Sequence, residues 1–130
     1  MNFTFLSLHS SLMVMCGGAI GAWLRMTVIQ WFLTIMPGVP TGMVIVNLVG
    51  SFIIGFVYIP LSAMHLLWLK LLIIGGLLGA LTTFSTFALD VLILLESKKA
   101  PLALAIAVAV PILSILSAFL GAVLFKRFFV

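Results

Sequence analysis

The chain has 130 residues, of which 65% are hydrophobic and 6% are charged, and its mean hydropathy is +1.50. A soluble domain this small cannot bury so much apolar surface, so the composition excludes a soluble protein and predicts an all-α integral membrane protein. The net charge of +4 is not combined with aromatic residues on a soluble face, so nucleic-acid binding is not expected, and the lone Cys16 cannot form an internal disulfide.

Four apolar segments predict four transmembrane helices in a single domain. Their approximate bounds are 12–36, 43–59, 66–95 and 101–125. A turn rich in proline and glycine ends the first segment, Pro60 ends the second, and Pro101 suits the first position of the fourth helix. No positive charge precedes the first segment, which continues past Arg25, so we expect a retained span rather than a cleaved signal peptide.

The third segment is too long for one straight span, since a helix needs about 20 residues to cross the hydrocarbon core. Its stretch from Gly75 to Asp90 contains three glycines, four hydroxyl side chains and one carboxylate. Polar groups at membrane depth must be buried in protein or line a water-filled path. We therefore predict that the third helix is broken between about Gly79 and Phe84, where free backbone carbonyls and amides can bind ions.

Files of small polar side chains follow three of the expected helices. They are Asn47, Ser51 and Tyr58 on the second helix, Thr83, Thr86 and Asp90 on the third, and Ser114 and Ser117 on the fourth. Such files can hold helices together through interhelical hydrogen bonds. They also suit a small ion that must shed its water and leave again. Phe84 and Phe87 lie beside the third file and could offer ring edges to an anion, although such a pair is also typical of core packing.

Two charged residues, Arg25 and Asp90, lie inside the expected spans, where a lipid-exposed charge is costly. Arg25 either extends to a lipid headgroup or faces a vestibule and attracts anions. Asp90 is expected to be a hydrogen-bonded acceptor. The sequence offers no nucleophile–base pair, no paired carboxylates and no phosphate-binding loop, so we do not expect an enzyme.

Glycines at G-x-x-x-G spacing indicate close helix packing. The pairs are Gly17 with Gly21 in the first helix and Gly75 with Gly79 in the third. The spacing fits contacts within one subunit as well as between two subunits.

The basic residues outside the spans give little preference for one orientation. If the N-terminus is cytoplasmic, Lys70, Lys126 and Arg127 fall inside while Lys98 and Lys99 fall outside, which is three against two. The positive-inside rule needs a clear excess. The near-tie permits both orientations, and hence an antiparallel homodimer; a fixed topology set by other features is the alternative. Such flanking charges are also expected to contact the headgroups of the lipid bilayer.

The sequence resembles the Fluc (CrcB) family of bacterial fluoride channels. The resemblance rests on three runs: Gly-Gly-Ala-Ile-Gly-Ala at 17–22 followed by Arg25, Asn-Leu-Val-Gly-Ser-Phe at 47–52, and Gly-Ala-Leu-Thr-Thr-Phe-Ser-Thr-Phe at 79–87. It implies antiparallel dual-topology dimers of four-helix subunits with two fluoride pores and one central sodium ion. It also implies passive fluoride export across the bacterial inner membrane, which relieves fluoride toxicity.

The resemblance implies roles for particular residues. The fluoride pore would contain Asn47, Phe84, Ser85, Thr86, Phe87 and Ser114. Arg25 would lie in the vestibule, and the backbone carbonyls of Gly79 and Thr82 would bind sodium. The sequence departs from the family pattern at Met43, where threonine is usual, at Ala88, where serine is frequent, and in the fourth helix, where only Ser114 is kept.

Two alternatives accompany this interpretation. A small multidrug-resistance-type cation/proton exporter also has four short helices, but it needs an acid in the first helix, where this chain has only Arg25. The other alternative is a non-conducting subunit, whose polar residues serve as glue. A paralogous partner could then complete a heterodimeric fluoride channel.

Overall fold

The structure is a computed structural model and describes residues 7–130. Its helical elements are α1 (Leu8–Ile35), α2 (Thr41–Ala63), α3 (Leu67–Lys70), η1 (Leu71–Leu78), α4 (Gly79–Leu81), α5 (Phe84–Glu96) and α6 (Ala100–Phe129). They make four helical runs that are long and apolar enough to cross a membrane, with α3 to α5 together forming the third. The prediction of an all-α protein with four membrane-spanning helices is confirmed.

Two helix ends differ from the sequence-based bounds. The second helix continues through Pro60 to Ala63, so the predicted end at Ile59 is wrong. Proline removes one backbone donor, but the helix continues because Leu61 is buried and the Met64 N–H donates to the Pro60 carbonyl at 3.0 Å. The fourth helix runs on to Phe129, beyond the predicted end at residue 125, with the Phe125 and Phe129 rings stacked 5.2 Å apart.

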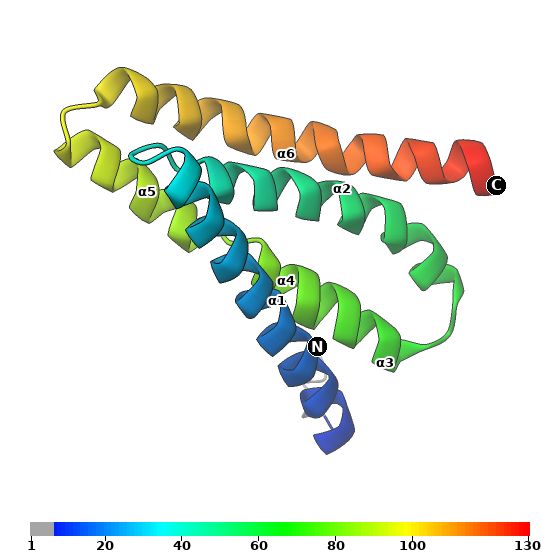
Figure 1. Cartoon of the computed structure of the whole chain (residues 1–130). Helices are drawn as coiled ribbons and strands as arrows, with labels where there is room; N and C mark the ends of the chain where they lie inside the picture. Colours follow the sequence, from blue (N-terminus) through cyan, green and yellow to red (C-terminus); the bar gives the residue numbers. More distant parts are fainter. Residues whose placement is uncertain (1–6) are drawn as a thin grey trace, which may run out of the picture.

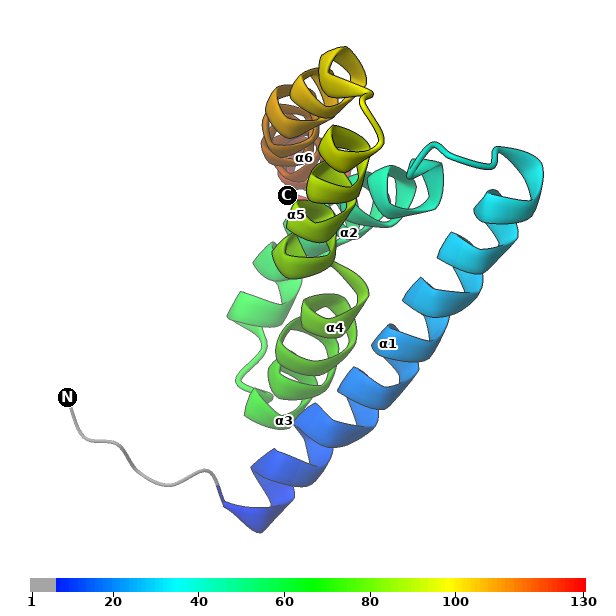
Figure 2. The same ribbon diagram turned by 90° about the vertical axis from the view of Figure 1, so that its left-hand side faces the viewer.

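The second and fourth spans form one pair, and the third span contacts the first span with its first half and the fourth span with its second half. α2 and α6 lie side by side along most of their lengths (Figure 1). α1 lies against η1 and α4, whereas α5 contacts α6, as the turned view also shows (Figure 2). The third span therefore passes from one neighbour to another between α4 and α5, and the polar side chains of this region meet at that point.

Close backbone approach holds α1 against η1. A Cβ added to Gly17 or Gly21 would collide with backbone atoms of η1, and one added to Gly76 would lie 2.7 Å from the Val14 carbonyl oxygen. The predicted packing role of the Gly17–Gly21 pair is confirmed within the chain. In η1 the contact is made by Gly76 rather than by the predicted pair Gly75 and Gly79, which stays exposed. Gly76 lies on the face of the π-helix η1 that is turned toward α1.

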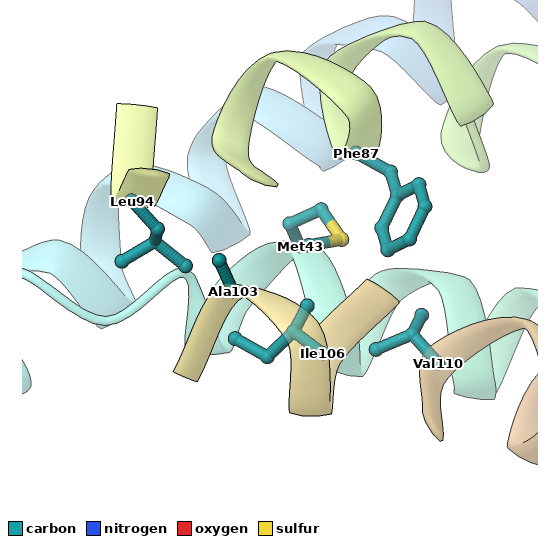
Figure 3. Close-up of a cluster of buried hydrophobic side chains, with 6 residues drawn as sticks. All are labelled: Met43, Phe87, Leu94, Ala103, Ile106 and Val110. Atoms are coloured by element: carbon teal, nitrogen blue, oxygen red, sulfur yellow. The ribbon is translucent and has the colours of Figure 1, made fainter. Parts of the chain in front are cut away.

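A small hydrophobic core fixes α5 on the α2–α6 pair. It consists of Met43, Phe87, Leu94, Ala103, Ile106 and Val110, which come from these three helices (Figure 3). Met43 has only 1% of its surface exposed and lies among the others. The Phe87 ring is thereby held at the edge of this core, next to the interruption of the third span.

Candidate functional site

A groove of about 260 Å³ opens where the third span is interrupted. Its walls come from α2, the residues between α4 and α5, the start of α5, and the middle of α6. The lining residues are Asn47, Ser51, Thr82, Thr83, Phe84, Phe87, Val110, Pro111 and Ser114. None of these side chains carries a charge, so the groove offers neutral hydrogen-bonding groups between apolar walls.

The backbone is extended at Thr82 and Thr83, whose ψ angles are 141° and 130°. In a continuous α-helix the Thr83 N–H would donate to the Gly79 carbonyl. Here it donates to Oδ1 of Asn47 at 3.1 Å instead. The Gly79 carbonyl therefore loses its usual helical donor, while the Thr82 hydroxyl donates to the Leu78 carbonyl at 2.9 Å.

Asn47 joins α2 to this interruption. Because a backbone N–H can only donate, its contact with Oδ1 fixes which end of the amide faces Thr83. One hydrogen of the amide nitrogen is used by the Met43 carbonyl at 3.1 Å. The second amide hydrogen has no acceptor within residues 7–130, and the side chain is 9% exposed and lines the groove. The amide is thus held in place with one donor available.

The two phenylalanines differ in their surroundings. Phe87 is 6% exposed and belongs to the core, while Phe84 is 73% exposed. Their ring centroids are 5.2 Å apart and their planes are inclined by 43°. Both rings line the groove, so one is fixed by this chain and the other faces outward from it.

The predicted hydroxyl groups separate into two sets. Ser114, on α6, lines the groove. Ser85 and Thr86 are not among its lining residues. The Ser85 hydroxyl instead lies 2.9 Å from the hydroxyl of Thr83, the second of the two extended residues.

The predicted vestibule residue Arg25 lines neither the groove nor a second cavity near the loops. Its Nε is buried and has no hydrogen-bond partner within residues 7–130. Asp90 lines the second cavity, which has a volume of about 300 Å³ and also contains Ser97 and Lys99. The Lys99 amine donates to the Gly38 carbonyl at 3.2 Å and closes one side of it.

A cation bound by side chains has little support in the described part of the chain, since no group of three or more His, Cys, Asp or Glu residues lies together there. Backbone oxygens at the interruption are the better candidates, because Gly79 has lost its helical donor and Thr82 is extended. The residues predicted for sodium therefore suit a cation that prefers hard oxygen ligands.

Sequence reasoning missed part of the groove. Val110, Pro111 and the Thr83 backbone N–H were not predicted to belong to it, and Ser51 was assigned only to a polar file. A usable signal for Thr83 is its place inside the predicted helix break, where a backbone N–H needs a new acceptor. The apolar lining of α6 carries no comparable signal in the sequence.

Comparisons with known proteins agree on one family. A family described as "CrcB-like protein, Camphor Resistance (CrcB)" matches residues 12–122. A protein of Acinetobacter baylyi named "Fluoride-specific ion channel FluC" is 45% identical over 101 residues, which cover 76% of this chain and 80% of the relative. A protein of the same name from Parabacteroides distasonis is 36% identical over 117 residues, or 88% of this chain and 91% of the relative. One from Rhizobium leguminosarum is 47% identical over 94 residues, with coverage of 69% and 74%.

Proposed function

Because the chain belongs to the CrcB family, we propose that it is a fluoride-selective ion channel of the membrane and not an enzyme. The observation that carries the proposal is the uncharged groove at the interruption, where the fixed amide of Asn47, the hydroxyl of Ser114 and the ring of Phe84 meet. Relatives that share most of this chain bear the name fluoride-specific ion channel. The chain would thus be a multi-pass protein of the bacterial inner membrane that lets fluoride leave the cell passively.

Fluoride is small and strongly hydrated, so a selective pore must replace its water with many short hydrogen bonds. The free N–H of Asn47 and the serine hydroxyl supply such bonds, and the positive edges of the phenylalanine rings continue the path. Ser85 and Thr86 would complete it from the first turn of α5. Because the groove has no fixed charge, a bound anion is not held too tightly to leave.

We further propose that the working channel is an antiparallel homodimer whose partner covers the groove. The support is that Phe84, a large apolar ring beside the polar lining, is 73% exposed in the single chain. The interruption of the third span would persist in this assembly, at the dimer centre. A C-terminal reporter fused to the chain should be found on both sides of the membrane, and labelling on one side alone would exclude the antiparallel homodimer.

A sodium ion at the dimer centre is the third part of the proposal. The backbone carbonyls of Gly79 and Thr82 from both subunits would hold it, and the ion would supply positive charge that holds the two interruptions together. Arg25 on α1 would attract anions toward the vestibule in this arrangement. Prolonged removal of sodium should lower the melting temperature of the purified dimer and stop flux; an unchanged dimer in sodium-free buffer would contradict the site.

The decisive experiment is anion efflux from liposomes that contain the purified chain, with fluoride compared with chloride. Rapid fluoride efflux without chloride efflux is expected. No fluoride efflux from the chain alone, but efflux after addition of a paralogous subunit, would identify a non-conducting member of a heterodimer. Proton-coupled uptake of organic cations would instead support a small exporter and contradict the channel.

A further inference from the structure

Several hydroxyl side chains in this protein donate to a nearby carbonyl, as expected in an apolar surrounding. Thr27 donates to the Trp23 carbonyl at 2.9 Å and Thr34 to the Trp31 carbonyl at 2.6 Å. Ser117 donates across to α2, to the Leu48 carbonyl at 2.8 Å. These bonds use the only proton of each hydroxyl, so these residues have none left for a ligand.

The Ser51 hydroxyl is one of several without any hydrogen bond in the described residues, and of these only those of Ser51 and Ser114 line the groove. Its hydroxyl makes no hydrogen bond with any residue of the described range 7–130, and it lines the groove together with Ser114, which behaves in the same way. A helical serine can turn its hydroxyl toward the carbonyl one turn earlier. Because the Ser51 hydroxyl has no partner among the described residues, its proton is available to a molecule in the groove.

The position of Ser51 places this proton close to the interruption. Ser51 lies one turn after Asn47 on α2, so both side chains are on the same face of the helix. The neighbouring Gly50 is in direct contact with Thr82, and a Cβ at this glycine would collide with the Thr82 methyl group. Ser51 therefore follows directly on a residue of α2 that contacts the extended segment.

We propose that the Ser51 hydroxyl coordinates the transported anion, as a third donor beside the Asn47 amide and the Ser114 hydroxyl. The inference rests on the proposed fluoride channel and adds a specificity-determining residue to it. Because Ser51 and Ser114 come from two different helices of the α2–α6 pair, they can hold an ion between them. A small anion that accepts short hydrogen bonds gains more from such a pair than a larger one.

The test is fluoride efflux from liposomes with Ser51→Ala, compared with the parent at equal amounts of assembled protein. Loss of one donor to a charged ligand should slow fluoride efflux about tenfold or more. Ser117→Ala is the matched control, because it removes the same group from α6 where the hydroxyl is already bonded to a carbonyl. This control should retain fluoride efflux close to that of the parent.

A second pair of variants separates the hydroxyl from the size of the side chain. Ser51→Thr and Ser51→Val have nearly the same shape, but only the first keeps the donor, so the threonine variant should conduct faster. Parent-like efflux in Ser51→Ala, or equal efflux in the threonine and valine variants, would overturn the role of Ser51. If the parent itself conducts no fluoride, the proposed function fails, and this inference fails with it.

Discussion

The α2–α6 pair and the groove beside it differ in whether their hydroxyl groups are hydrogen-bonded to the protein. In the pair, Gly55 lies against the Ala118 backbone and Gly121 against that of Phe52, so the two helices are in direct backbone contact. The Ser117 hydroxyl of α6 is also bonded across the pair, to the Leu48 carbonyl of α2. In the groove, only a few residues away, Ser51 and Ser114 keep free hydroxyls within the described chain.

This difference separates what holds the protein together from what contacts an ion. Helices in a membrane associate through small residues and bonded polar groups, because lipid gives no hydrophobic force between them. A site that binds and releases an ion needs donors that the protein leaves unpaired. The following predictions test whether stability and conduction really divide along this line.

The largest effect is expected where the α2–α6 contact is broken. In Gly55→Val the new side chain would collide with the Ala118 backbone, which cannot move without separating the helices. We expect a loss of stability on the order of 3 kcal/mol or more, the upper part of the range for overpacked sites. The measurement is the yield of monodisperse protein by size-exclusion chromatography, together with its melting temperature.

Gly18→Ala provides the matched control for this prediction. No atom lies within 4 Å of a Cβ at Gly18, so the substitution should leave yield and melting temperature close to those of the parent. If Gly55→Val were as stable as Gly18→Ala, the close approach of α2 and α6 would not be a stabilising contact.

Asn47→Asp should give the largest effect on conduction. The carboxylate can still accept from the Thr83 N–H, but it loses the free amide donor and places a negative charge in the anion path. We expect fluoride efflux to fall about 100-fold or more, since removing a bond to a charged ligand and adding repulsion act together. Efflux from liposomes measures this, and size-exclusion chromatography should show an assembled protein. Parent-like efflux would place Asn47 outside the pore.

Substitutions of the two phenylalanines should differ in their effects on thermal stability and on fluoride efflux. Phe84→Ile changes a ring that is 73% exposed in the single chain, so the subunit should remain folded while fluoride efflux slows about tenfold through loss of the ring edge. Phe87→Ile changes a core ring that is 6% exposed, and it should also lower the melting temperature. Equal thermal stability of the two variants would contradict their different roles.

Much of this division could be predicted from the sequence, since it depends on local patterns. Hydropathy predicts the four spans. The family resemblance directs attention to Asn47, Phe84, Phe87 and Ser114, which the structure brings together in one groove. Glycine spacing predicts close packing at Gly17 and Gly21, and the structure supplies the partner, which is the third span.

The remainder depends on contacts between distant segments, which no local pattern contains. The bond from the Thr83 N–H to Asn47 joins residues 36 positions apart. Gly76 meets the α1 backbone at Val14, a contact between distant segments that glycine spacing within the third span does not predict. Pro60 lies inside α2 because neighbouring residues stay packed, which propensity alone does not predict.

The smallest effect, and the sharpest test of the comparison, comes from two serines on α6. Ser117→Ala removes a bonded hydroxyl from the helix pair, and Ser114→Ala removes a free hydroxyl from the groove. Interhelical hydrogen bonds of this kind contribute about 0.6 kcal/mol on average, so Ser117→Ala should lower the melting temperature slightly and leave fluoride efflux unchanged. Ser114→Ala should do the reverse, with efflux slowed several-fold and a melting temperature near that of the parent.

Both variants should be measured for melting temperature and for fluoride efflux on the same preparations. If stability and conduction depend on different regions, the result is crossed: one variant loses only stability and the other loses only efflux. Because the substitutions are chemically identical and three residues apart, differences in helix propensity or membrane depth cannot explain such a crossing. If both variants lost efflux in proportion to stability, the groove would depend on the helix pair as a whole, and the free hydroxyl of Ser114 would have no separate role. A crossing would instead show that α6 stabilises the protein with one serine and contacts the ion with the next.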